Sequence, residues 1–216
     1  MLKPHQEQCI DLLLQHNVLK FGEFTLKSGR ISPYFFNLGE LHSGWALQQL
    51  ARCYSVCLQE FVPDVEVLFG PAYKGIPLVA GCAMELSEQF QRDMSYAFNR
   101  KEIKNHGEGG VLVGASVKGK KVVLIDDVLT AGTAIRQSLD LLQQLGAQVV
   151  GVVLALNRAE KGTDEQLAAA QIEKTYDIPV RHIIDLDDIL SYITIHPEYD
   201  AYLPQMRAYR KQYGVE

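Results

Sequence analysis

The 216-residue sequence has no apolar run long enough to cross a bilayer, and its first residues, MLKPHQEQ, lack the apolar core of a secretory signal. It also lacks a basic excess, since 21 Lys and Arg residues stand against 26 Asp and Glu, a formal net charge of −5. Nucleic-acid-binding proteins normally carry a basic excess. We therefore expect a cytoplasmic protein whose partners are neither membranes nor nucleic acids.

Cysteine is scarce and lacks the spacing of a metal site. The chain has four cysteines, none in a C-x-x-C pair and none beside a histidine at ligand spacing. Cys53 and Cys57 lie four residues apart in an apolar helical pattern, which favours packing. We expect reduced thiols and no metal site built from protein side chains. The phosphate-binding pattern G-x-x-x-x-G-K-[ST] is absent as well.

The apolar residues that are present predict alternating strands and helices. Hydrophobic residues make up 47% of the chain and charged residues 22%, as in a packed globule. Apolar strands are predicted at 65–69, 95–100, 111–113, 121–126, 149–156 and 180–184. Helices are predicted at 4–18, 43–61, 75–90, between 133 and 146, and at 164–176, 187–193 and 198–213. This alternation indicates an α/β fold with a mostly parallel sheet flanked by helices.

The most informative segment is VVLIDDVLTAGT, residues 122–133. Asp126 and Asp127 follow an apolar strand, at the sheet edge where α/β proteins bind ligands. The following turn, Thr130 to Thr133, offers hydroxyls, main-chain N–H groups and a helix N-terminus, which suit a phosphate. Carboxylates beside a phosphate cradle fit a ribose 5-phosphate. Taken separately, the two halves are also compatible with solvated acids at a strand end and an ordinary helix cap.

Three further segments supply positive charge. Gly70-Pro71-Ala72-Tyr73-Lys74-Gly75 joins a strand to a helix and suits a second anion such as pyrophosphate, although ordinary Gly-Pro turns look similar. The polar, glycine-containing loop at about 100–110 is predicted to be a mobile lid over a polyphosphate, or else a solvated hairpin tip. Arg158 ends a strand and suits a carboxylate, unless it forms a surface ion pair.

The segment from Lys27 to Asn37, KSGRISPYFFN, combines basic and aromatic residues. It is predicted to form an irregular hairpin within a small N-terminal hood, contributed by about residues 1–40. Its aromatic rings could bind a planar base, or they could simply pack on the domain.

Together these segments resemble the orotate phosphoribosyltransferases, a family of type I phosphoribosyltransferases. The matching pieces are LKSGRISPYFFNLG, FGPAYKGIPL, FNRKEIKNHGEGG, VVLIDDVLTAGTA and a later NR, and none departs at a motif position. The resemblance implies one phosphoribosyltransferase domain over residues 1–216. It implies transfer of phosphoribose from phosphoribosyl pyrophosphate (PRPP) to orotate, giving orotidine 5′-monophosphate and pyrophosphate in pyrimidine (UMP) biosynthesis. It further implies Mg²⁺ and a homodimer in which the lid reaches the partner's site.

The resemblance and the charges together assign the residue roles. Lys101, Asp126 and Asp127 are the expected catalytic residues. The 5-phosphate is expected at Thr130, Ala131, Gly132 and Thr133, and Val128, Leu129 and Ala134 are further substrate-binding residues. The pyrophosphate is expected at Tyr73, Lys74, Arg100, Lys101, Lys104 and His106. The base site is expected at Lys27, Phe35, Phe36 and Arg158, with Lys27 also near PRPP.

Two other functions are open to a chain with a PRPP motif. A purine phosphoribosyltransferase has no use for a carboxylate clamp, so Arg158 and the aromatic pair argue against it. A PRPP-sensing regulator of nucleic acid would need a basic helix-turn-helix segment and no lid, and the sequence has the opposite.

Overall fold

The computed structural model describes residues 2–26, 29–104, 110–130, 132–161 and 167–214, without the side chains of residues 102–104. Its central sheet has the strand order β5-β4-β3-β6-β7-β8. The strands are β3 (Val67–Gly70), β4 (Ser95–Lys104), β5 (Gly110–Gly114), β6 (Lys121–Leu129), β7 (Gln148–Asn157) and β8 (Val180–Asp185). All pairs are parallel except β4 with β5. The expected α/β fold with a mostly parallel sheet is confirmed.

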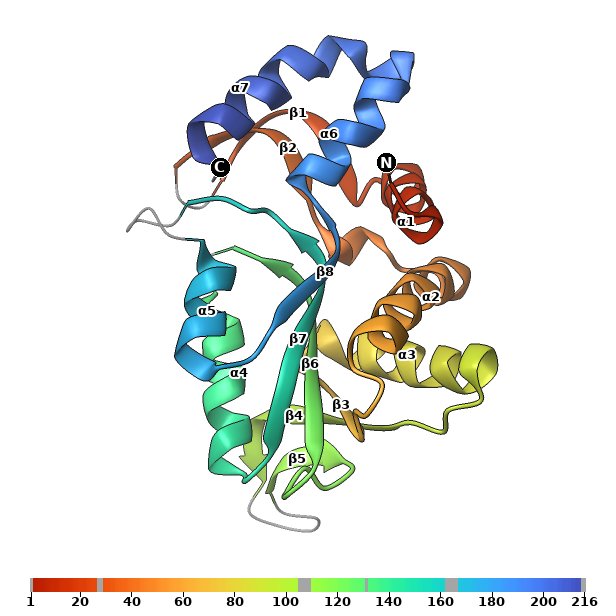
Figure 1. Ribbon diagram of the computed structural model, residues 1–216, viewed down its shortest axis with the longest axis vertical. Helices are drawn as coiled ribbons and strands as arrows, with labels where there is room; N and C mark the ends of the chain where they lie inside the picture. The colour runs from red at the N-terminus through yellow and green to blue at the C-terminus, as the bar shows by residue number, and fades with distance from the viewer. Residues whose placement is uncertain (1, 27–28, 105–109, 131, 162–166, 215–216) are drawn as a thin grey trace.

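Helices cover both faces of this sheet. α2 (Gly44–Phe61) and α3 (Gly75–Phe90) lie on one face, and α4 (Thr133–Gln144) and α5 (Ala168–Tyr176) lie on the other (Figure 1). Alternate residues of β6 point to opposite faces of the sheet. Val123 and Ile125 belong to the core on the side of α2 and α3. Val122 and Leu124 belong to the core on the side of α4 and α5. Burial on both sides explains why the sequence of this strand is continuously apolar.

A smaller layer sits over the carboxyl ends of the strands. It contains the antiparallel hairpin of β1 (Leu19–Thr25) and β2 (Ile31–Phe36), with α1 (Pro4–Gln15), α6 (Leu186–Ile195) and α7 (Leu203–Tyr213) around it (Figure 1). Short 3-10 turns, η1 (Leu38–Glu40) and η2 (Pro197–Tyr202), complete it. The rings of Tyr34 and Tyr209 pack edge to face, with their centroids 6.0 Å apart. The hood therefore includes C-terminal helices as well as the predicted N-terminal residues.

Several element boundaries differ from the prediction. The helix predicted at 198–213 is a 3-10 turn, η2, followed by α7, and the helix predicted at 4–18 ends at Gln15. β6 was predicted to end at Asp126, but Val128 and Leu129 continue to pair with β7. β4 extends to Lys104, so the predicted lid begins within a strand, and residues 105–109 lie outside the described part of the chain. α5 begins at Ala168, and residues 162–166 before it are likewise outside. Among the helices that the structure describes, none has the length and apolarity to cross a membrane.

The strand order reverses between β3 and β6. The chain leads from β3 outward to β4 on one side, and from β6 outward to β7 and β8 on the other. The carboxyl ends of strands at such a reversal are where open α/β sheets bind ligands. The turn after β6 and the loop after β3 both start at this point.

Candidate active site

The two acidic residues lie where β6 extends past the end of β3. β3 pairs with β6 only as far as Leu124, whereas β7 pairs with it to Leu129. Asp126 and Asp127 therefore have a paired strand on one side and an open edge on the other. The hydroxyl of Tyr54, from α2, donates to the main-chain oxygen of Asp126 at 2.7 Å and holds the backbone there.

The carboxylates differ in their surroundings. Asp127 is buried, and its Oδ2 accepts a hydrogen bond from Nζ of Lys74 at 2.9 Å. Burial, and next the negative charge of Asp127, raise the pKa of the Asp126 carboxyl to about 6. Neighbouring acids in a desolvated position favour a cation or hydroxyl donors, because either relieves their repulsion. This electrostatic arrangement is suited to a polyhydroxylated ligand with a bound cation.

The turn after β6 presents the N-terminus of α4. Gly132 caps this helix with φ of +77°, a conformation that glycine adopts without steric cost. Thr130, Thr133 and Ala134 are exposed around it, and Ala131 lies outside the described residues. First-turn N–H groups have no acceptor within their own helix, so they are free to bind an anion. Leu129 is buried and Val128 partly buried, and both pair with β7.

The loop after β3 is closed by two glycines in contact. A Cβ atom on Gly70 would lie 2.2 Å from the main-chain oxygen of Gly75, and a Cβ on Gly75 would lie 2.6 Å from the carbonyl carbon of Gly70. The main-chain N–H of Ala72 donates to Oδ1 of Asn99 on β4 at 2.8 Å, and the Ala72–Tyr73 peptide is cis. This tight loop leaves Tyr73 and Lys74 exposed at the start of α3.

The predicted lid begins beside that loop. Nζ of Lys101 lies 4.4 Å from the centroid of the Tyr73 ring in the same chain. Arg100 is half-buried, and its Nε is buried without a hydrogen-bond partner in the part of the chain that the structure describes. Lys104 is described only by its main chain at the end of β4, and His106 lies outside the described residues. The structure thus brings Lys74 to Asp127 and Lys101 to the neighbouring residue Tyr73.

Arg158 follows β7 and is buried beneath the hood. Its Nε donates to Oε1 of Glu160 at 2.8 Å, and its Nη2 lies 2.7 Å from the same oxygen. Nη2 also donates to the hydroxyls of Ser32 at 3.2 Å and Tyr209 at 3.4 Å. The guanidinium lies over the ring of Tyr34, 4.2 Å from its centroid. The predicted carboxylate-binding arginine is therefore held rigidly against the hairpin.

The two predicted base-site aromatics lie on opposite sides of β2. Phe36 is buried on the same side as Ser32 and Tyr34, which contact Arg158. Phe35 is 37% exposed and stacks on Phe24 with ring centroids 5.4 Å apart. Lys27 lies outside the described residues. The structure therefore places Phe36 and Arg158 on a common face, with Phe35 turned away.

The residues that hold this site leave little signal in the sequence. Glu160, Tyr34 and Tyr209 surround Arg158, and Tyr54 and Asn99 hold the backbone of the acid strand and of the glycine loop. Except for the contact of Arg158 with Glu160, two positions away, these interactions join segments far apart in the chain. Only the short spacing of Glu160 from Arg158 could have suggested its role.

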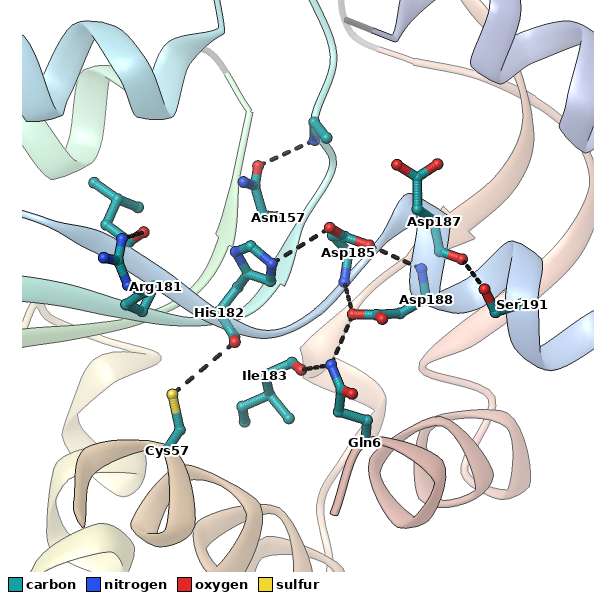
Figure 2. Close-up of polar contacts among 12 residues, drawn as sticks. Gln6, Cys57, Asn157, Arg181, His182, Ile183, Asp185, Asp187, Asp188 and Ser191 are labelled. Carbon is teal, nitrogen blue, oxygen red and sulfur yellow. Dashed lines mark hydrogen bonds and ion pairs between the residues drawn. The ribbon is translucent and has the colours of Figure 1, made fainter. Parts of the chain in front are cut away.

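A second group of ionisable side chains lies on β8 and in the first turn of α6. His182, Asp185 and Asp188 offer ligand atoms within 4.8 Å of one another (Figure 2). Asp185 and Asp188 form reciprocal side-chain to main-chain hydrogen bonds at the start of α6, and Oδ2 of Asp188 also accepts from Nε2 of Gln6 at 2.9 Å. Burial and the charge of Asp185 raise the pKa of Asp188 to about 6. These contacts join α1 to α6 and explain the cluster as a helix cap.

A cavity of about 590 Å³ lies among α1, β1, α6 and η2 of the hood. It is lined by aromatic side chains of β1, α6 and η2, among them Phe21, Phe24, Tyr192, Tyr199 and Tyr202. Its lining includes none of the predicted site residues. The candidate active site is thus defined by its charges and helix N-termini at the strand reversal, and not by this cavity.

Comparisons with known proteins agree with this geometry. Residues 46–189 match the model of the phosphoribosyl transferase domain family. An orotate phosphoribosyltransferase of Nitrosococcus oceani is 47% identical over 215 residues, covering 100% of this chain and 98% of that protein, and one of Pseudomonas aeruginosa is 49% identical over 214 residues, covering 99% and 100%. The crystal structure of orotate phosphoribosyltransferase from Francisella tularensis superposes with a TM-score of 0.86 at 43% identity, covering 95% of this chain and 98% of that one.

Identity near one half over the full length, together with the matching fold and domain, identifies the relationship. The chain belongs to the orotate phosphoribosyltransferase family.

Proposed function

We propose that this chain transfers the phosphoribosyl group of PRPP to orotate, forming orotidine 5′-monophosphate and pyrophosphate in pyrimidine (UMP) biosynthesis. Membership of the orotate phosphoribosyltransferase family supports the reaction. The observation that carries the residue assignment is the meeting of an acid pair, a glycine loop and two helix N-termini at the strand reversal between β3 and β6.

PRPP is proposed to span this reversal. Its 5-phosphate accepts hydrogen bonds from the turn at the start of α4, and its ribose hydroxyls meet Asp126 and Asp127. Its pyrophosphate lies at the start of α3, where Lys74 contacts Asp127 and Lys101 lies over the ring of Tyr73. The residues proposed to bind PRPP are Tyr73, Lys74, Arg100, Lys101, Lys104, His106, Asp126, Asp127, Val128, Leu129, Thr130, Ala131, Gly132, Thr133 and Ala134.

The donor set fits Mg²⁺ as the proposed cofactor. Mg²⁺ prefers oxygen ligands, retains several waters and binds proteins through one or two carboxylates plus substrate phosphates. Mg²⁺ would bind mostly substrate oxygens and waters, and Asp126 and Asp127, at an open strand edge, would contact the ribose hydroxyls directly or through Mg²⁺ and water. When bound, Mg²⁺ would neutralise charge on the pyrophosphate.

The reaction needs no protein nucleophile. Breaking the bond between C1 and the pyrophosphate develops positive charge on the ribose and negative charge on the leaving group. Lys74 and Lys101 lie where that negative charge grows, and cations placed in advance lower the barrier. Orotate is itself an anionic nucleophile, so a strong general base is unnecessary.

The base is proposed to bind beside Phe36 and Arg158. Phe36 shares the face of β2 that contacts the guanidinium, and Arg158 has the planar donor geometry that pairs with a carboxylate. Phe35 and Lys27 remain proposed members of the base site, Phe35 despite its outward-facing ring.

Three further features are proposed for the whole molecule. The chain forms one domain over residues 1–216 and assembles as a homodimer in which each lid, at about 100–110, reaches the partner's site. Its four cysteines are free thiols, which agrees with the proposed cytoplasmic location. The family resemblance and the length of the glycine-containing loop after Lys101 support sharing between subunits.

Base selectivity tests the proposal. Absorbance of orotate should fall when PRPP and Mg²⁺ are added, whereas uracil, adenine and hypoxanthine should be consumed at least about 100-fold more slowly, because they offer Arg158 no carboxylate. Comparable kcat/KM for orotate and uracil would refute the role of Arg158. Consumption of a purine in place of orotate would refute the proposed reaction.

A further inference from the structure

Glu160 is the side chain that joins Arg158 to the hood hairpin. Its Oε1 accepts hydrogen bonds from Nε of Arg158 at 2.8 Å and from the hydroxyl of Tyr34 at 3.2 Å. Its Oε2 lies 3.6 Å from Nη1 of Arg30. The Glu160 carboxylate thus contacts the nearby Arg158 and also Arg30 and Tyr34, which lie more than 120 residues earlier in the chain.

These contacts determine which edge of the Arg158 guanidinium is available. Glu160 occupies Nε and Nη2, and the hydroxyls of Ser32 and Tyr209 also accept from Nη2. Stacking on Tyr34 fixes the plane of the group. Nη1 is the nitrogen to which no described residue is hydrogen-bonded, so this edge can receive an incoming carboxylate.

The charges of the cluster favour one further anion. Arg30 and Arg158 contribute two positive charges, and Glu160 contributes one negative charge, at closely spaced positions with low exposure. Since desolvated charges are costly unless paired, a cluster with one uncompensated cation gains from a bound carboxylate. Without Glu160, two cations would remain together and their repulsion would displace the guanidinium.

The main chain of Glu160 and Lys161 is held by Tyr213 and Gly214, at the end of α7. N–H of Lys161 donates to the carbonyl of Tyr213 at 2.8 Å, and Glu160 pairs with Gly214 in an isolated bridge. Arg30 also lies over the ring of Tyr213, 4.8 Å from its centroid. The position of Glu160 is therefore set by the residues that follow α7, and not by β7 alone.

We propose that Glu160 is a positioning residue for orotate specificity, which orients Arg158 so that Nη1 meets the carboxylate of the base. This inference rests on the proposed function, in which Arg158 binds that carboxylate. Glu160 itself does not touch the substrate. It acts by fixing the plane and the occupied edge of the guanidinium and by balancing one of the two arginine charges.

The test compares Glu160→Ala and Glu160→Gln with the wild-type enzyme. In Glu160→Ala, kcat/KM for orotate should fall about 10- to 100-fold, an effect expected when a specific polar contact is lost. The ratio of kcat/KM for orotate to that for uracil should fall by a similar factor, while the Kd for PRPP and Mg²⁺ measured without base stays within about twofold. Glu160→Gln retains an acceptor for Nε and should recover part of the ratio.

Controls separate this role from a structural one. Glu60 forms an exposed ion pair with Lys3 on the surface, and Glu60→Ala should change none of these values. A lower Tm for Glu160→Ala with an unchanged orotate-to-uracil ratio would overturn the inference and leave the proposed function intact. A wild-type enzyme that does not distinguish orotate from uracil would instead overturn the proposed role of Arg158.

Discussion

At the residue scale, the ionisation of Asp126 has a cost that can be measured. Its pKa is raised from 3.8 to about 6, so the folded protein retains a proton that the unfolded chain releases. The contribution of protonated Asp126 to the free energy of unfolding is therefore fully present below pH 4. It is lost as the pH rises towards 6. Asp126→Asn should stabilise the ligand-free protein at pH 8 by about 2 kcal/mol, and this gain should vanish near pH 4.

Thermal or urea unfolding at the two pH values measures this difference. Asp93 is an exposed aspartate outside the site, and Asp93→Asn should stay within about 0.5 kcal/mol of wild type at either pH. A stabilisation by Asp126→Asn that is equal at both pH values would contradict the electrostatic account.

The sequence indicates site residues well where chemistry and local pattern coincide. Asp126 and Asp127 follow an apolar run, so their place at a strand edge is predictable. The position of Arg158 at a strand end is equally predictable from the sequence. Its burial and its contacts with Ser32 and Tyr209 are not predictable. Those contacts connect positions far apart in the chain, and no local periodicity encodes them.

At the element scale, the loop between β3 and α3 depends on the absence of side chains. Gly75→Ala would place a Cβ 2.6 Å from the main chain of Gly70, so backbone must shift. We expect a loss of about 1–3 kcal/mol in the free energy of unfolding, and weaker PRPP binding because the start of α3 moves. Urea unfolding and PRPP titration measure the two effects.

Gly44 at the start of α2 is a suitable control, since a Cβ there meets nothing within 4 Å. Gly44→Ala should be neutral or stabilising by about 0.5 kcal/mol. If Gly75→Ala were equally neutral, close contact of the two glycines would not be what shapes the loop.

The strand that leads into the lid brings Lys101 to Tyr73. Lys101→Ala should lower kcat by about 10²–10³-fold if this cation meets charge that grows in the transition state. Steady-state kinetics with orotate and PRPP provide the measurement. Lys118 precedes β6 at the opposite end of the sheet, and Lys118→Ala should retain wild-type kcat. A rise in KM with unchanged kcat would mean that Lys101 binds ground state and transition state equally.

Periodicity predicted most elements, since their apolar positions repeat at helical or strand spacing. It placed the end of β6 three residues early, because Val128 and Leu129 continue to pair with β7 beyond the acids. Strand ends are decided by the neighbouring strand, which a local pattern does not contain. For the same reason, the sequence predicted a lid from about residue 100, whereas β4 continues to Lys104.

At the scale of the whole molecule, the C-terminal helices are part of the site's support. Tyr209 of α7 contacts Arg158, and Tyr213 holds the segment of Glu160. The sequence predicts helices in this part of the chain but indicates no functional residue there. Their contribution is packing against the hairpin of β1 and β2, as in the contact of Tyr209 with Tyr34, 175 positions earlier. The parallel sheet itself was predictable from the alternation of strands and helices.

Sharing of the lid between subunits is also a property of the whole assembly. If Lys101 acts in the partner's site, a hybrid dimer of Lys101→Ala and Asp127→Asn has one intact site. Random exchange makes about half of the dimers hybrid, so mixing two inactive variants should restore roughly a quarter of wild-type activity. No recovery, with hybrids confirmed by native mass spectrometry, would show that each subunit uses its own lid.

The central claim is that the acid pair at the strand reversal supports phosphoribosyl transfer to orotate. Chromatography with mass detection can follow orotidine 5′-monophosphate and pyrophosphate formed from orotate, PRPP and Mg²⁺. The account predicts equal amounts of the two products from the wild-type protein and almost none from Asp127→Asn with an unchanged circular dichroism spectrum. Unequal products from the wild type, or wild-type turnover by Asp127→Asn, would contradict it.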